Sequence, residues 1–248
     1  MNIRPKHVIR SSGALLAGVI ALLAACGGGG GSNGANIMSR TIAFSGTAAT
    51  GKALPNATIS ISCAQGSMSV MADANGSYRA TLAAVAPCLI TATSGGTLLH
   101  STAFADGTYN VTPETDLMLS YLAAQLGTNE SILISGFATN TQFQQALANQ
   151  NNVLTAQAAV VQIFQQSYGV TLSAPDFLIT PFAVGQPGVD RDLQTLTARG
   201  VTDADGEPDP AAVALVTMTG AAHPIATSPV PNSGGTGGAG SPGAGGMM

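Results

Sequence analysis

The strongest constraint on the fold is a change of hydrophobic period at Thr112. Between residues 41 and 112, short segments alternate apolar and polar residues, and Gly, Pro and Asn separate them, as in strands joined by turns. After Thr112, apolar residues recur at helical spacing along much of the chain to residue 225. A block of strands followed by a block of helices predicts an α+β fold rather than alternating βαβ units.

The strand block is predicted to form an antiparallel β-sandwich, because six or seven short strands follow one another closely. The expected strands cover residues 41–45, 57–63, 68–71, 78–82, 87–93, 97–104 and 109–112. Within residues 57–63, the alternate residues Ala57, Ile59, Ile61 and Cys63 share one face. The dipeptide Asn75-Gly76 is typical of a tight hairpin turn, so the strands on either side of it are expected to pair.

Helix signals begin directly after the strand block. Thr112 is a good N-cap residue, Pro113 suits the first helical position, and Gly127 can end the helix. The acidic residues Glu114 and Asp116 complement the positive helix N-terminus. Further helices are expected at residues 140–149, 153–168 and 190–199, and residues 131–138 fit either a helix or a strand.

The first 26 residues have the three parts of an export signal: a basic start, an apolar run over residues 14–25, and small residues before Cys26. The run of 12 residues is too short to span a bilayer, which takes about 20 helical residues. The stretch Leu23-Ala24-Ala25-Cys26 resembles the lipobox of bacterial lipoproteins and argues against an ordinary cleaved signal.

This resemblance implies a location, and composition and hydrophobic period divide the rest of the chain. Residues 1–25 would be a lipoprotein signal peptide, and Cys26 would carry a diacylglyceryl group and an acyl chain such as palmitate that anchor the chain in membrane lipid. Glycine at position 27 favours transfer to the outer membrane, facing the periplasm or the cell surface. Residues 26–40 are expected to be a flexible linker, 41–112 the β-sandwich, 113–225 the helical region and 226–248 a disordered Gly/Pro-rich tail.

An exported protein folds in an oxidising compartment, which bears on the remaining cysteines. With Cys26 lipidated, Cys63 and Cys88 form an even pair and favour a disulfide. Two reduced core cysteines and a metal site are the alternatives. No second pair of nearby His or Cys ligands accompanies them, which argues against the metal site.

Turn motifs in the strand block resemble the carboxypeptidase regulatory-like, or transthyretin-like, β-sandwich. They are GTA at residues 46–48, GKALPNA at 51–57 and ADANGSY at 72–78. The order of sandwich and helices, with Asn-Val-Thr-Pro at 110–113 between them, is also similar to a group of uncharacterised proteobacterial lipoproteins. Both resemblances imply a fold and no activity, since the sandwich is an accessory module beside many activities.

Composition excludes one class of partner. Only 8% of residues are charged, and removal of the three basic residues of the signal would take the formal net charge from −4 to −7. Nucleic-acid binding needs a basic surface that displaces counterions from phosphates, and none is expected here.

Catalytic motifs are weak. The G-x-S-x-G match at residues 30–34 lies in the linker, and the G-x-G-x-x-G match at 235–240 lies in the tail, so neither has the strand and helix it requires. His100 could join Asp73 or Asp106 in a Ser-His-Asp triad, but an outward-facing strand residue is the preferred interpretation. His223, near the tail, is expected to be solvated.

Carboxylates give one further candidate. Asp203, Asp205, Glu207 and Asp209 could gather a cation such as Ca²⁺, although a solvated acidic loop is favoured. Asp190 and Asp192 lie two residues apart on a predicted helix and should face different ways. The sequence therefore predicts no enzyme activity, cofactor or metal site. It predicts an envelope lipoprotein with a scaffolding or binding role toward an unidentified envelope protein or glycan. An envelope hydrolase and a carbohydrate- or peptide-binding module are the alternatives.

Overall fold

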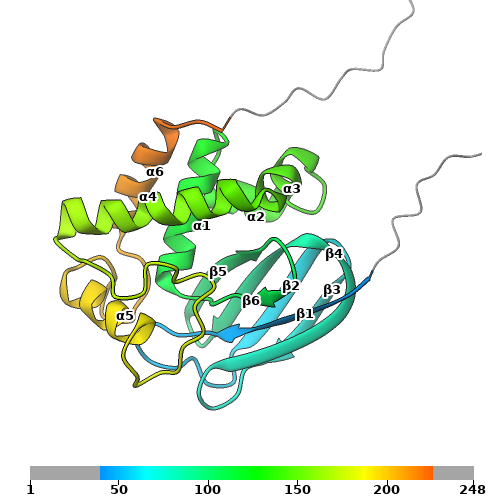
Figure 1. Cartoon of the computed structure of the whole chain (residues 1–248), viewed down its shortest axis with the longest axis horizontal. Helices are drawn as coiled ribbons and strands as arrows, with labels where there is room; N and C mark the ends of the chain where they lie inside the picture. The colour runs from blue at the N-terminus through cyan, green and yellow to red at the C-terminus, as the bar shows by residue number, and fades with distance from the viewer. Residues whose placement is uncertain (1–39, 226–248) are drawn as a thin grey trace, which may run out of the picture. The chain divides into compact units, whose positions relative to one another are not determined.

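Strands precede helices in the computed structural model, which describes residues 40–225 (Figure 1). The strands are β1 (Arg40–Thr47), β2 (Thr58–Gln65), β3 (Ser67–Met71), β4 (Ser77–Ser94), β5 (Thr97–Ala103) and β6 (Gly107–Thr108). The helices are α1 (Pro113–Gln125), α2 (Glu130–Gly136), α3 (Thr141–Ala148), α4 (Gln150–Tyr168), α5 (Val189–Ala198) and α6 (Pro210–Ala221). This order confirms the predicted α+β class. The predicted signal peptide, Cys26, both glycine motifs and the tail lie outside the described residues.

The long strand β4 organises the sheet. Residues 78–82 and 87–93, expected as separate strands, belong to this one strand of 18 residues. Its first half pairs antiparallel with β1, and its second half lies between β2 and β5. One strand therefore joins the two halves of the β region, and β1 passes in front of the β2–β5 half in Figure 1.

The turn at Asn75-Gly76 was predicted correctly, but the two strands beside it do not pair with each other as expected. The turn itself forms: Gly76 has a φ of +78°, and the Asp73 carboxylate accepts hydrogen bonds from the backbone N–H groups of Asn75 and Ser77. However, β3 pairs with β2, because Gly66, with a φ of +88°, already reverses the chain between them. The strand after Gly76 pairs with β1 instead.

The last strand is shorter than expected and departs from the antiparallel pattern. β6 comprises two residues paired in parallel with β1, where residues 109–112 were expected to form a strand. The buried Asn110 side chain instead donates to the carbonyl groups of Phe177 and Thr180 and accepts from the N–H of Thr47. These bonds attach the loop before α5 to the strand region.

A disulfide joins Cys63 on β2 to Cys88 on β4, as predicted. The two residues face each other directly in the β2–β4 register. Both side chains are buried in the same hydrophobic core as Ile59 and Ile61. The expectation that Ala57, Ile59, Ile61 and Cys63 share a buried face is therefore confirmed.

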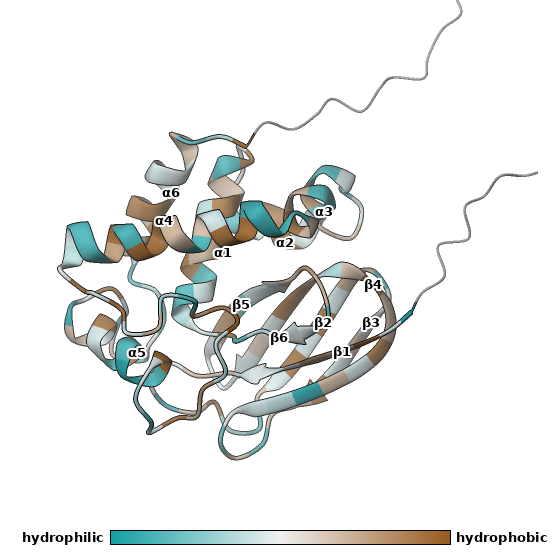
Figure 2. Cartoon of the chain, viewed as in Figure 1, coloured by the Kyte–Doolittle hydropathy of each residue, from teal (hydrophilic) through white to brown (hydrophobic). Residues whose placement is uncertain are grey.

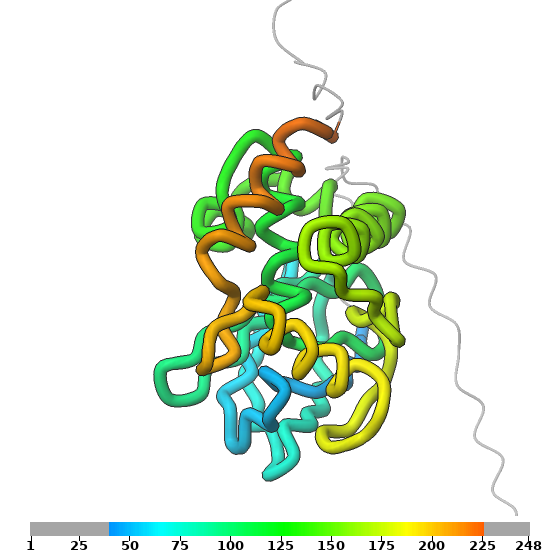
Figure 3. The backbone as a smooth tube through the Cα atoms, turned by 90° about the vertical axis from the view of Figure 1, so that its left-hand side faces the viewer, coloured from blue at the N-terminus to red at the C-terminus, as the bar shows by residue number. Residues whose placement is uncertain are grey.

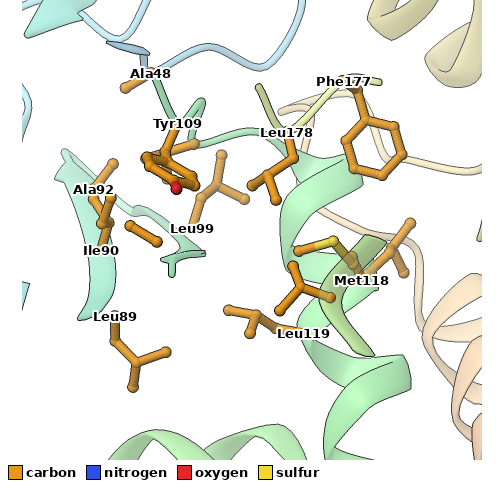
Figure 4. Packing of buried hydrophobic residues seen from close by; sticks show 14 of the residues in the cluster. Ala48, Leu89, Ile90, Ala92, Leu99, Tyr109, Met118, Leu119, Phe177 and Leu178 are labelled. Carbon is orange, nitrogen blue, oxygen red and sulfur yellow. The ribbon is translucent and has the colours of Figure 1, made fainter. Parts of the chain in front are cut away.

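Helix α1 is the centre of the helical region. Thr112 caps it as predicted, in a capping box with Thr115, and Pro113 occupies the first turn. All of its residues except Asp116 are buried. Met118 and Leu119 extend from it toward Leu99 on β5 and toward Leu178 of the loop before α5, so strands and helices share one core (Figure 4).

Helices α3 to α5 follow the predicted positions closely. Asn140 and Asn149 cap α3 and α4, and Gly169, in the left-handed conformation, ends α4. Hydrophobic residues alternate with hydrophilic ones along α4 in Figure 2, as expected for a helix with one buried face. The ambiguous residues 131–138 are largely helical, within α2 and the turn that follows it.

Helix α6 was not predicted. Its twelve residues are apolar or small on every side, so they show no amphipathic period. It packs along α1 (Figure 3), where a Cβ added to Gly220 would lie 2.5 Å from the carbonyl oxygen of Tyr121. Glycine is therefore required for this close approach of two helices. Among residues 40–225, no helix is long and apolar enough to cross a bilayer.

The disulfide gives a first prediction. It closes a loop of 25 residues, and loss of that constraint in the unfolded chain should lower the free energy of unfolding by about 3 kcal/mol. We expect reductant to produce this loss in urea unfolding followed by circular dichroism. The double variant Cys63→Ala/Cys88→Ala should be less stable and should not respond to reductant. Equal stability of the wild type with and without reductant would contradict the prediction.

Candidate functional site

A cleft of about 620 Å³ opens between β5, α1, α2 and α6. Its apolar lining comes from Leu98, Ile134 and Val213, and its polar lining residues include His100, Asp116, Ser120, Asn129, Glu130, Ser131, Ser135 and Thr217. These residues come from four separate elements, so only the packing of α1 against β5, α2 and α6 brings them together. A cleft with an apolar wall and a few convergent titratable groups is the usual form of a ligand site.

His100 holds the centre of the polar group. Its Nδ1 lies 2.9 Å from Oδ1 of Asp116 and 3.2 Å from Oε1 of Glu130. Its backbone is attached to the first turn of α1: the His100 N–H donates to Asp116 Oδ1 at 2.8 Å, and the Thr115 hydroxyl donates to the His100 carbonyl at 2.8 Å. The imidazole is therefore held against two carboxylates from two helices.

Glu130 is oriented from α1 as well. The Ser120 hydroxyl donates a hydrogen bond to Oε2 of Glu130, which leaves Oε1 facing His100. Oε1 is buried and makes no hydrogen bond of good geometry. Within residues 40–225, His100, Asp116 and Glu130 are the one group of three side chains with potential metal-ligand atoms close to one another.

The electrostatics of the cluster favour a charged imidazole. Burial alone would lower the pKa of His100, but hydrogen bonds and charge attraction from Asp116 and Glu130 outweigh it and raise the pKa to about 9. Burial and the neighbouring charge of Glu130 raise the pKa of Asp116. The contact with His100 lowers it, but does not cancel the rise. At neutral pH the cluster thus retains a proton that holds its two carboxylates together.

The triads considered from the sequence do not form. Asp106 is ion-paired with Arg40 at 3.2 Å, and Asp73 caps its own turn, so neither contacts His100. The preferred interpretation of His100 as an outward-facing residue was also wrong, since its side chain is only 15% exposed and meets two carboxylates. His223 is exposed, as expected, and its Nδ1 lies 2.9 Å from the carbonyl of Thr219.

Three of the four acidic side chains after α5 accept hydrogen bonds from backbone N–H groups. Asp203 Oδ1 accepts from the N–H groups of Asp205 and Glu207, and Asp209 caps α6. Glu207 Oε1 accepts from the N–H of Leu98 at the edge of the cleft. The carboxylates of Asp203, Glu207 and Asp209 therefore have separate partners.

Asp190 and Asp192 face different ways, as predicted from their spacing. Asp190 accepts from the N–H of Gly185 and from the side chain of Gln194. Asp192 accepts from the backbone and hydroxyl of Ser173 and from the next backbone N–H. Both residues therefore attach loops to α5.

Glu114, in the first turn of α1, is fully buried and neither of its carboxyl oxygens makes a hydrogen bond of good geometry. Burial is the main reason that the pKa of Glu114 is raised well above its ordinary value, and repulsion from Asp192 adds to it. The side chain of Thr112 opposes the shift and is the weaker influence. Glu114 lies outside the cleft lining.

Sequence reasoning missed Asp116, Ser120 and Glu130 as site residues. Asp116 was interpreted only as a favourable charge at a helix N-terminus. One signal was available: Asp116 and Ser120 are four residues apart on a largely apolar helix, so they share one face. Their partners His100 and Glu130 come from other elements and follow no fixed spacing.

Comparisons with known proteins identify no relatives. No family model, no curated protein and no solved structure matches the chain.

Glu114 gives a prediction on pH dependence. A carboxyl group with a raised pKa in the folded state stabilises fully below its unfolded pKa of about 4.3, and this contribution is lost as pH rises through the folded pKa. We expect the free energy of unfolding of Glu114→Gln to equal that of the wild type near pH 4. At pH 8 it should be higher by about 1–3 kcal/mol in urea unfolding, because the neutral amide has no charge to bury. The exposed Asp205→Asn is the control. A wild-type chain that is more stable than Glu114→Gln at pH 8 would contradict the raised pKa of Glu114.

Proposed function

We propose that this chain is a lipid-anchored envelope protein whose folded part binds a ligand in the cleft between β5, α1, α2 and α6. The anchor is acylated Cys26, and glycine at position 27 favours the outer membrane, with the folded part facing the periplasm or the cell surface. The role is non-catalytic. The observation that carries the binding role is the cleft itself, with an apolar wall and the His100–Asp116–Glu130 cluster at its base.

Two observations support export and anchoring. The sequence places a basic start and a short apolar run before Leu23-Ala24-Ala25-Cys26. Cys63 and Cys88 form a disulfide, which is usual for proteins that fold in oxidising compartments. A lipid anchor and an oxidised core pair are properties of the same compartment, so each supports the other.

The lining of the cleft favours an apolar peptide over a sugar. Leu98, Ile134 and Val213 supply apolar surface, and Asn129, Ser131 and Thr217 supply hydrogen-bonding groups. No aromatic ring on which a sugar could stack is among the lining residues of this cleft in the described chain. A short peptide segment of an envelope partner, with one or two apolar side chains, matches this chemistry.

A hydrolase is the second candidate, and the titratable cluster in a cleft is the observation that favours it. The hydrogen bonding of Ser120 argues against it. In a Ser-His-Asp triad the carboxylate holds Nδ1 of the histidine and the serine hydroxyl donates to Nε2. Ser120 instead donates to Glu130, and within residues 40–225 no serine hydroxyl is hydrogen-bonded to His100. We therefore favour binding.

The anchor is tested by acyl labelling. Cells producing the wild-type chain should incorporate labelled palmitate into it and retain it in the membrane fraction, because the cysteine thiol receives the lipid. Cys26→Ala should lose both the label and the membrane association, whereas Cys63→Ala should keep the label. Failure of the wild-type chain to take up palmitate in a bacterial host with intact lipoprotein processing would contradict the anchor.

The cleft is tested by ligand binding. We expect some members of a library of short apolar peptides to raise the melting temperature of the full chain, measured in detergent with a chelator present. Ile134→Arg should abolish the response by filling the cleft. Ile132→Arg, on the exposed face of the same helix, should retain it. A melting temperature unmoved by every peptide, or an equal response in both variants, would contradict the binding role.

A further inference from the structure

The three side chains at the base of the cleft are arranged as metal ligands. Tetrahedral zinc, with bonds of about 2.0–2.2 Å, holds its ligand atoms about 3.3 Å apart. Nδ1 of His100 lies 2.9 Å from Oδ1 of Asp116 and 3.2 Å from Oε1 of Glu130. One carboxylate oxygen from each acidic residue and a ring nitrogen of His100 lie within 4.8 Å of one another, so a small outward movement of the ligands, with release of the Nδ1 proton to solvent, would admit an ion.

We propose that His100, Asp116 and Glu130 bind a divalent transition-metal ion, and that Zn²⁺ is the best match. Two carboxylates balance the charge of a divalent cation, and one imidazole with two carboxylate oxygens suits zinc better than the all-oxygen sets of Mg²⁺ and Ca²⁺. Three protein ligands leave a fourth position of the tetrahedron open. That position faces the cleft, because all three ligands line it.

The ligands are held in place by an outer set of hydrogen bonds, as in established zinc sites. Asp116 Oδ1 accepts from the His100 N–H, and the Thr115 hydroxyl fixes the His100 carbonyl. The Ser120 hydroxyl binds Oε2 of Glu130 and leaves Oε1 for the ion. Oε1 is buried and faces Nδ1 of His100 at 3.2 Å without hydrogen-bond geometry, so a cation would take the place of the imidazole proton.

The inference deepens the proposed function and rests on the same cleft as the binding site. A zinc ion with an open position would bind a Lewis-basic atom of the ligand, such as a peptide carboxylate, while the apolar wall holds the rest. It departs from the sequence prediction of no metal site. That prediction considered ligands close together in the sequence, whereas these three come from the separate elements β5, α1 and α2.

The test is zinc binding to the full chain, purified without a polyhistidine tag and stripped with a chelator that is then removed. Isothermal titration with Zn²⁺ should show one site at the cleft, and the melting temperature should rise with zinc. We expect His100→Gln and Glu130→Gln to weaken affinity by about 100-fold or more, and Ser120→Ala by about tenfold. His223→Gln and Asp205→Asn are the matched controls and should bind zinc like the wild type.

Circular dichroism separates loss of ligands from loss of the fold, and Glu130→Gln keeps the size of the side chain. Equal zinc affinity in the wild type and in folded Glu130→Gln and His100→Gln would overturn the proposal, as would binding lost in His223→Gln. Because the peptide test uses a chelator and the zinc test uses the metal alone, the two can fail separately. Peptide binding without zinc binding would overturn only the metal site, and zinc binding without peptide binding only the peptide ligand.

Discussion

The structure depends on the attachment of the first turn of α1 to strand β5 at His100. Two backbone groups of one strand residue are used there: the His100 N–H donates to Asp116, and its carbonyl accepts from Thr115. The same Thr115 forms the capping box with Thr112. One short stretch therefore ends the strand block, begins the central helix and fixes the distance between them. Because His100 also carries the imidazole of the cluster, the contact that joins strands to helices also forms the base of the cleft.

The burial of α1 follows from this attachment and explains why the helical region needs the sheet. An isolated helix of 13 residues is marginal in water, and all residues of α1 except Asp116 are buried in the folded chain. It is covered on its sides by β5, α4 and α6, which are the elements in most contact with it. Its two polar residues on one face, Asp116 and Ser120, are directed to the cleft rather than to bulk solvent. The buried helix α1 thus places a carboxylate beside the apolar wall of the cleft.

The parts of the fold that follow local rules were predictable. Thr112, Pro113 and Gly127 marked the ends of α1 by capping chemistry that acts within one turn, and residues 57–63 alternated because a strand buries one face. Where a partner had to be chosen, prediction failed. The turn at Asn75-Gly76 was placed well but its strands pair elsewhere, because register is decided by the whole sheet. Helix α6 was not predicted because it is apolar on all sides and so shows no amphipathic periodicity in the sequence.

The sequence alone determined the α+β order and most helix ends, favoured a disulfide between Cys63 and Cys88, and supplied the residues from which an envelope location is proposed. Each of these depends on neighbours in the chain, on a count of cysteines or on a short contiguous motif. The tertiary structure decided the cleft and its cluster. His100, Asp116 and Glu130 are 16 and 14 residues apart and lie on three elements, so no spacing marks them as a group. They meet because α1 packs against β5 and α2, and packing is a property of complete surfaces rather than of local pattern.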